Sequence, residues 1–253
     1  MYPELFSIGP LTFYTYGFLV LLGIILSFLV CRAAAGREGI ERPVFENLFF
    51  WSLLWGFIGA RILYVVTEWE SFLKTPWEII FNRSGFVFYG GFFFGGLALY
   101  FISTKKKINF FKIADIFILG VPLAHSFGRI GCFCYGCCYG VPTSSGIGVL
   151  FPPDSPAGML GAKVIPTQLI SALSLFMIFI LLLLLRKKKR FNGQLLVAYL
   201  FLYSTFRFII EFFRGDPRGT VFNIPTSQFI SLFMFIAAVV LLFALPRKKN
   251  SGR

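Results

Sequence analysis

The chain has 253 residues, of which 57% are apolar and 19% aromatic, while only 14% are charged. Ordinary soluble domains carry about 25% charged residues, so this composition excludes a soluble globular domain, a disordered chain and a collagen-like fibre. Unbroken apolar runs such as Ile178–Leu185 contradict the alternation of a membrane barrel. The net charge of +13 lies in short loops, where it indicates membrane topology rather than nucleic-acid binding. We therefore predict an all-α integral membrane protein with no nucleic-acid partner.

Seven segments carry the roughly 20 apolar residues that a helix needs to cross a bilayer. We expect them to form one polytopic membrane domain over residues 1–253. The longest connection, 131–165, is rich in Gly, Pro and Ser and could form a small cap. In chain order the predicted spans are Leu11–Val30, Val44–Val66, Phe86–Ile102, Ile113–Ile130, Pro166–Leu185, Gln194–Phe213 and Ile224–Leu245.

The basic residues divide the connections into two sets, which alternate along the chain as seven spans require. The positive-inside rule assigns the richer set to the cytoplasm. The N-terminus and the loop 131–165 are therefore expected outside, and the C-terminus inside. The richer set comprises Arg32, Arg37, Arg42, Lys105, Lys106, Lys107, Lys112, the run at 186–190, Arg247, Lys248, Lys249 and Arg253, and the poorer set comprises Lys74, Arg83, Lys163, Arg214 and Arg218.

Ionisable residues inside a span are costly and therefore face the bundle interior or a water-filled cavity. At a rise of about 1.5 Å per residue, Arg61, Arg129 and Arg207 lie roughly 20–25 Å from the cytoplasmic ends of their helices. This depth places them in the outer third of the membrane. Tyr16 and Tyr89 open inward-running spans and share this level. The ionisable residues in question are Arg61, Arg129, Arg207, Glu211 and His125.

Arg207, Glu211 and Arg214 follow one another at i, i+4 and i+7, so one face of the sixth helix is expected to carry all three. Arg207 and Glu211 could form a purely structural ion pair, which lowers the cost of burying both. The arginines at this depth outnumber the single carboxylate, however, so the site favours an anion. A guanidinium binds phosphate through two hydrogen bonds, and a phosphate at this level indicates a phospholipid headgroup.

Four cysteines fall within seven residues of the segment G-R-I-G-C-F-C-Y-G-C-C-Y-G, as Cys132, Cys134, Cys137 and Cys138. They could form a metal or redox site, or they could be small residues at a tight turn that form a disulfide outside the cell. A single C-x-x-C pair is a weak zinc signal, and His125 is not at a recognised ligand spacing. We predict no metal and no cofactor from this pattern.

These residues lie in segments that resemble the prolipoprotein diacylglyceryl transferases of bacteria, in order and over nearly the whole chain. Each segment alone would be weak evidence for the family, but their joint occurrence at these intervals, with the predicted topology, is specific to it. The segments are I-G-P-L-T-F-Y-T-Y-G at 8–17, E-N-L-F-F at 46–50, G-A-R-I-L-Y at 59–64, F-Y-G-G-F-F-F-G-G at 88–96, H-S-F-G-R-I-G at 125–131 and F-R-F-I-I-E-F-F-R at 206–214.

The resemblance implies an enzyme of the bacterial cytoplasmic membrane whose active site faces the outer leaflet. It would transfer the diacylglyceryl group of phosphatidylglycerol to the lipobox cysteine of secreted preprolipoproteins and release glycerol phosphate. Arg129 and Arg207 match the family's two essential arginines and are assigned to the phosphate. Glu211 would position Arg207 or accept a proton, and Tyr16 would bind the lipid.

The chain departs from the family pattern at several site positions. Tyr89 replaces the histidine of the family's H-G-G segment, while Cys132 and Tyr135 replace two asparagines and Cys137 replaces a glutamate. An alternative is therefore a membrane thiol–disulfide protein that uses Cys132–Cys138, or a non-catalytic phospholipid-binding protein. The predicted catalytic residues are Arg129, Arg207, Glu211 and Tyr89, and the predicted substrate-binding residues are Arg129, Tyr16, Arg61, Arg214, Cys132 and Cys137.

Overall fold

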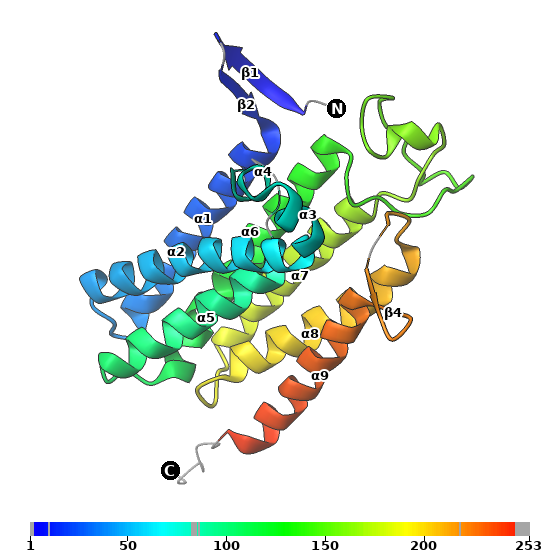
Figure 1. Ribbon diagram of the computed structural model, residues 1–253. Helices are drawn as coiled ribbons and strands as arrows, with labels where there is room; N and C mark the ends of the chain where they lie inside the picture. Colours follow the sequence, from blue (N-terminus) through cyan, green and yellow to red (C-terminus); the bar gives the residue numbers. More distant parts are fainter. Residues whose placement is uncertain (1–2, 10, 82–84, 86, 218, 246–253) are drawn as a thin grey trace. The chain divides into compact units, whose positions relative to one another are not determined.

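The computed structural model describes residues 3–9, 11–81, 85, 87–217 and 219–245 (Figure 1). Several residues used in the sequence analysis lie outside this part: Pro10, Arg83, Phe86, Arg218, Arg247, Lys248, Lys249 and Arg253. The elements are β1 Glu4–Ile8, β2 Leu11–Tyr14, α1 Thr15–Arg37, α2 Arg42–Thr67, α3 Trp69–Lys74, α4 Pro76–Phe81, α5 Phe88–Lys105, α6 Phe110–Tyr135, η1 Gly158–Leu160, α7 Thr167–Arg186, α8 Gln194–Ile210, η2 Glu211–Phe213, β3 Thr220–Val221, β4 Ile224–Pro225 and α9 Thr226–Ala244.

Six helices of the described residues are long and apolar enough to cross a membrane, namely α1, α2, α6, α7, α8 and α9. Each coincides with a predicted span, which confirms the all-α integral membrane protein. The remaining predicted span, Phe86–Ile102, which is the third in chain order, is represented by α5, a helix of 18 residues. It contains four glycines and two tyrosines and is not among the six. The orientation of the termini stays a prediction.

The segments before α1 and after α2 differ from the sequence prediction. The first span was expected to begin at Leu11, but β1 and β2 form an antiparallel hairpin, and α1 begins at Thr15. Gly9, with φ of 59°, supplies the left-handed residue that this turn requires. The short helices α3 and α4, which the hydropathy pattern did not indicate, lie between α2 and α5.

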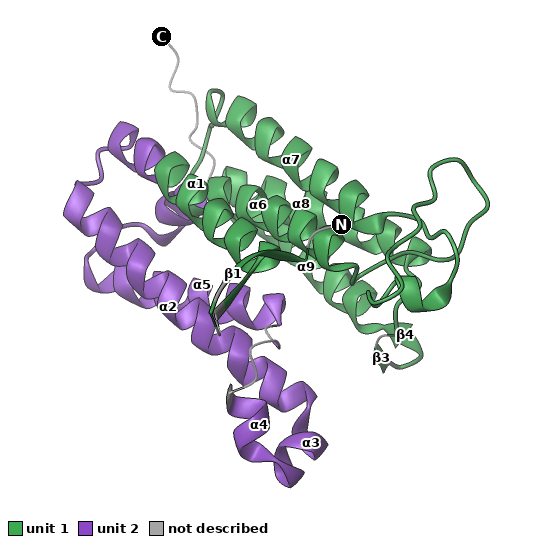
Figure 2. Ribbon diagram, turned by 90° about the horizontal axis from the view of Figure 1, so that it is seen from above, with its two compact units in different colours: residues 1–31, 117–253 green, residues 32–116 purple. Residues whose placement is uncertain are grey.

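The chain divides into two compact units, residues 1–31 with 117–253 and residues 32–116 (Figure 2). In the second unit α2 and α5 pack against each other through glycines. A Cβ atom on Gly90 would meet the carbonyl oxygen of Gly59 and lie 2.7 Å from Cβ of Leu63. Glycine therefore permits the close backbone approach that is common between membrane helices.

In the first unit, small residues bring α1 against α6. A Cβ atom on Gly23 would lie 3.0 Å from Cβ of Phe127, and Ser27 Oγ donates a hydrogen bond to the carbonyl of Gly120 at 2.7 Å. Farther along, a Cβ atom on Gly131 would lie 3.2 Å from Cα of Tyr16. The two helices therefore run antiparallel, with the start of α1 beside the end of α6.

The loop predicted over 131–165 begins later than expected, because α6 continues to Tyr135. Its segments are joined by bridges between Pro142 and Val164 and between Val149 and Val164. The loop also has a hydrophobic cluster of its own, formed by Tyr139, Phe151, Ala157 and Val164 with Phe133 and Val149 packed against it. This cluster orders the loop, whereas its position outside the membrane stays a prediction, as does the single domain over 1–253.

Candidate active site

Arg207 and Glu211 form the ion pair that their spacing predicted. Nη1 of Arg207 lies 2.6 Å from Oε2 of Glu211, and the two side chains are only 6% and 3% exposed. Arg207 belongs to the last turn of α8, and Glu211 opens η2. Because both charges are buried, each depends on the other for its stability in this position.

Arg214 does not continue this helical face, contrary to the expectation of one face with three charged residues. η2 ends at Phe213, and Arg214 is extended, with φ of −81° and ψ of 138°. Its guanidinium instead donates two hydrogen bonds to Asp216, from Nε to Oδ1 at 2.8 Å and from Nη2 to Oδ2 at 2.9 Å. Arg214 is thus held by a local bidentate ion pair.

The backbone around Arg214 joins the segment that follows α6. Arg214 forms an isolated bridge with Gly140, and the amide of Gly215 donates to the carbonyl of Tyr139 at 3.1 Å. A Cβ atom on Gly140 would lie 2.7 Å from the carbonyl oxygens of both Ile165 and Phe213. Only glycine at position 140 allows its own segment to pack against those of Ile165 and Phe213. This packing brings Arg214 to the cysteine cluster.

Arg129, nearly two turns before the end of α6, is in contact with His125. Nε of Arg129 donates a hydrogen bond to Nε2 of His125 at 3.2 Å. The positive charges of both Arg129 and Arg207 act on this imidazole, so the two predicted phosphate-binding arginines both lie near it. The ring of His125 also packs against Tyr203, with centroids 5.7 Å apart. The spacing along the chain did not indicate His125 as a metal ligand, but its contacts with Arg129 and Tyr203 make it part of the site.

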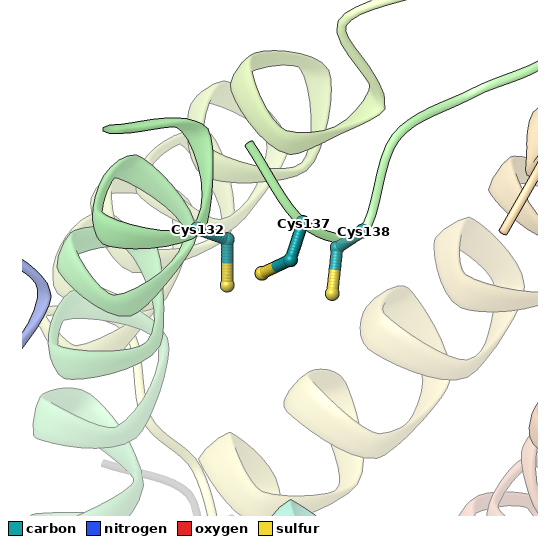
Figure 3. Close-up of side chains that lie close together, drawn as sticks. All are labelled: Cys132, Cys137 and Cys138. Carbon is teal, nitrogen blue, oxygen red and sulfur yellow. The ribbon is translucent and has the colours of Figure 1, made fainter. Parts of the chain in front are cut away.

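Three of the cysteines converge where α6 ends (Figure 3). Gly136, with φ of 81°, ends the helix in a Schellman motif, in which the amide of Cys137 donates to the carbonyl of Cys132 at 3.2 Å. This motif places Cys137 beside Cys132 of the last helical turn. The Sγ atoms of Cys132, Cys137 and Cys138 all lie within 4.8 Å of one another.

The first turn of α7 holds this cysteine loop in place. The buried side chains of Thr167 and Gln168 donate hydrogen bonds to the carbonyls of Cys138 and Cys137, at 2.9 and 2.8 Å. Neither residue was singled out from the sequence, because hydrogen bonds to a distant backbone leave no pattern along the chain. The cysteine positions are therefore fixed by two elements besides α6.

Charges near the loop alter two titrating groups outside the membrane spans. Hydrogen bonds with Cys132 and Cys137 hold the pKa of the Cys138 thiol well below its ordinary value, and the positive charges of Arg129 and Arg214 act in the same direction. Burial alone would lower the pKa of Arg214, but its hydrogen bonds to Asp216 and Cys138 raise it instead. The loop thus favours a thiolate beside a guanidinium.

Tyr16 joins the same site from the start of α1. Its ring packs against Gly131, and its hydroxyl is in electrostatic contact with Arg129 and with the cysteine cluster. The structure therefore brings together all seven predicted site residues of the first unit: Tyr16, Arg129, Cys132, Cys137, Arg207, Glu211 and Arg214. Cys134 does not join the cysteine group, although it forms the C-x-x-C pair with Cys137.

The two remaining predicted site residues, Arg61 and Tyr89, belong to the second unit. The guanidinium of Arg61 donates hydrogen bonds to backbone carbonyls, including those of Ile80 at 2.7 Å and Gly85 at 2.9 Å. The hydroxyl of Tyr89 is buried and has no hydrogen-bond partner among the described residues. Their convergence with the residues of the first unit stays a prediction. Asp115, a further buried ionisable residue of α6, was not singled out from the sequence.

The arrangement in the first unit suits an anionic substrate. Arg207 and Arg214 pair with the carboxylates of Glu211 and Asp216, and Arg129 donates a hydrogen bond to the imidazole of His125. Three guanidinium groups therefore gather near the ends of the spanning helices α6 and α8, where they can bind an anionic group. Fold and site together define an integral membrane protein with three arginines in the candidate site.

The chain belongs to the prolipoprotein diacylglyceryl transferase family, whose model matches residues 3–244. A protein of Clostridium perfringens (strain 13 / Type A), named phosphatidylglycerol–prolipoprotein diacylglyceryl transferase 2, is 39% identical over 250 residues, 97% of each chain. Transferases of Clostridium tetani and Clostridioides difficile are 35% and 37% identical, over 94% of this chain and 96% and 92% of theirs. The family is one of enzymes, and the thiol–disulfide alternative is not favoured.

Proposed function

We propose that this protein transfers the diacylglyceryl group of phosphatidylglycerol to the lipobox cysteine thiol of preprolipoproteins and releases glycerol phosphate. The observation that carries this proposal is that Arg129 donates a hydrogen bond to His125 and that the charge of Arg207 also acts on this imidazole. Two guanidinium groups at this site can bind the two non-bridging oxygens of a phosphodiester. The names of the relatives point to the same lipid and the same class of protein acceptor.

The reaction forms a sulfur–carbon bond and breaks a carbon–oxygen bond of the lipid. The thiolate is the nucleophile, so the lipobox thiol must lose its proton before or during attack. The departing glycerol phosphate takes the electron pair of the broken bond, and its negative charge grows in the transition state. Preorganised cationic donors stabilise that charge most effectively, and Arg129 and Arg207 are the donors of this site.

Glu211 holds Arg207 in position through its buried ion pair and is the carboxylate closest to that guanidinium. His125 performs the same task for Arg129, because its Nε2 accepts the hydrogen bond from Nε. Tyr16 lines the site near Arg129 and the cysteines, and the buried hydroxyl of Tyr89 has no hydrogen-bond partner among the described residues. Asp216 holds Arg214 within the first unit, and backbone carbonyls hold Arg61 within the second.

The enzyme resides in the bacterial cytoplasmic membrane, with the active site towards the outer leaflet. This orientation follows from the excess of basic residues in one set of loops. Phosphatidylglycerol and secreted preprolipoproteins are both accessible from that side. A reporter fused after Ala244 should be active in the cytoplasm, and activity outside would contradict the orientation.

The transfer reaction is tested with the full chain purified in detergent, phosphatidylglycerol and a lipobox peptide. Mass spectrometry should detect the diacylglyceryl thioether on the cysteine and an equal amount of glycerol phosphate. A peptide with serine in place of the cysteine is the matched substrate control. Failure to form the thioether, by protein that binds phosphatidylglycerol vesicles, would contradict the proposed reaction.

A further inference from the structure

No chemical step of the proposed diacylglyceryl transfer uses the cluster of Cys132, Cys137 and Cys138, although Cys132 and Cys137 are predicted to contact the substrate. Three sulfur atoms within 4.8 Å of one another exceed what a tight turn requires. Cys132 comes from α6, whereas the other two come from the loop that follows it (Figure 3). Cys134 and Cys31 do not belong to the cluster, so the convergence is selective within this chain.

The backbone fixes these positions before any ligand binds. The Schellman motif around Gly136 sets Cys137 beside Cys132, and the left-handed backbone of Cys138, with φ of 65°, turns the next thiol to the same place. Thr167 and Gln168 hold the loop through its carbonyls. A non-glycine residue in the left-handed region is uncommon, and such conformations cluster at functional sites.

We propose that Cys132, Cys137 and Cys138 bind a thiophilic metal ion, Zn²⁺ above all, through their three sulfur atoms. With zinc–sulfur bonds of about 2.3 Å, two sulfurs of a tetrahedral zinc lie about 3.8 Å apart. Rotations that shorten the sulfur–sulfur distances by about 1 Å at most complete the site. Each metal–sulfur bond replaces an S–H bond, so up to three protons pass to water when the ion binds.

The charges around the cluster suit this ligand set. Three thiolates exceed the charge of Zn²⁺ by one, and the guanidinium groups of Arg129 and Arg214 are both in electrostatic contact with Cys138. Soft thiolate ligands select Zn²⁺ or Cu⁺ over the hard cations Mg²⁺ and Ca²⁺. Three protein ligands leave one tetrahedral position open, as in catalytic zinc sites.

A disulfide is the competing arrangement of the same residues. It would join two sulfurs at about 2.05 Å and leave the third without a role. A disulfide would not explain why all three sulfur atoms lie close together. The sequence had favoured no metal because C-x-x-C was the only ligand pair in view, whereas the folded loop replaces Cys134 by Cys132 and adds Cys138.

The test uses the full chain with an affinity tag that contains no histidine, purified in detergent under reducing conditions without chelator. Inductively coupled plasma mass spectrometry should find close to one zinc per chain. Cys132→Ser, Cys137→Ser and Cys138→Ser should each lose most of this zinc. The matched controls Cys134→Ser and Cys31→Ser, which remove a thiol outside the cluster, should keep it.

Cobalt provides a readout that does not depend on a variant folding correctly. After chelation, Co²⁺ added to the unmodified chain should give intense sulfur-to-cobalt charge-transfer absorption and the visible bands of a tetrahedral site. The same ion should protect Cys132, Cys137 and Cys138 from alkylation. Diacylglyceryl transfer is measured separately, so loss of activity and loss of metal can be distinguished.

Three results would overturn the proposal. The first is zinc bound equally by the three cluster variants and the two controls. The second is unmodified protein that gives no cobalt–thiolate absorption after reduction. The third is metal-free purified protein in which two of the three cysteines form a disulfide. Each result stands whether or not the protein transfers diacylglyceryl groups.

Discussion

The carboxylate of Glu211 lies 2.6 Å from Nη1 of Arg207, and both side chains are almost fully buried. Removing one partner of such a pair leaves an uncompensated charge, which typically costs about 3–5 kcal/mol. We therefore expect Glu211→Ala to lower the thermal unfolding temperature in detergent and to reduce diacylglyceryl transfer by about a hundredfold or more, because Arg207 is displaced. Glu211→Gln, which keeps a hydrogen bond, should be less destabilising. Unchanged stability in the alanine variant would contradict the structural role of the pair.

Arg61 should contribute to stability more than to substrate affinity. Its guanidinium donates to backbone carbonyls that include those of Ile80 and Gly85. Each lost hydrogen bond leaves an acceptor without its donor, at about 1–3 kcal/mol where it is buried. Arg61→Lys cannot supply the same fork, so it should destabilise the chain nearly as much as Arg61→Ala. Unfolding in detergent followed by circular dichroism measures this, and loss of activity with full stability would favour direct lipid binding instead.

Gly140 should tolerate no side chain. A Cβ atom there would press on the carbonyls of Ile165 and Phe213 and separate Arg214 from Cys138. We expect Gly140→Ala to cost about 1–3 kcal/mol through overpacking and to reduce transfer strongly. Gly146→Ala, in the same loop and with open space around its Cβ position, is the matched control and should be neutral. Equal behaviour of the two variants in a thermal and a transfer assay would refute this account of the loop.

The contact between α2 and α5 makes a similar prediction in the second unit. Gly90→Ala would bring its methyl group against Gly59 and Leu63 and force the two helices apart, at about 1–3 kcal/mol. Gly96→Ala, on the same helix in open space, should be neutral or slightly stabilising because alanine favours helix. Thermal unfolding of the two variants in detergent provides the comparison. A stable Gly90→Ala protein would mean that the helices separate without cost.

Cys138 should remain reactive at unusually low pH in chelated protein. The pKa of its thiol is lowered, so the thiolate persists at pH values below the ordinary thiol pKa of about 8.5. In that range the thiolate fraction of an unperturbed thiol falls about tenfold for each pH unit. Iodoacetamide labelling between pH 8.5 and 6.5, followed by peptide mass spectrometry, should show a shallower decline for Cys138 than for a free cysteine peptide. Arg214→Gln removes a positive charge beside the thiol and should steepen that decline. An identical profile in both proteins would exclude the influence of Arg214.

Local spacing was sufficient for one pair of the site. Arg207 and Glu211 stand four residues apart within an apolar run, and a helix brings such residues together whatever surrounds it. The same rule applies to His125 and Arg129, whose side chains are joined by a hydrogen bond at this spacing. For Arg214 the rule failed, because α8 gives way to η2 before that residue.

The class of protein, the spanning helices and the family follow from the pattern of residues along the chain. A membrane leaves no water to satisfy backbone amides, so about 20 consecutive apolar residues must be helical whatever their neighbours are. The tertiary structure alone decided the rest of the site. Cys132, Cys137 and Cys138 meet Arg214 because Gly136 reverses the chain, Gly140 admits close backbone contacts, and Thr167 and Gln168 hold the loop. These contacts join residues far apart along the chain, and hydropathy contains no information about them.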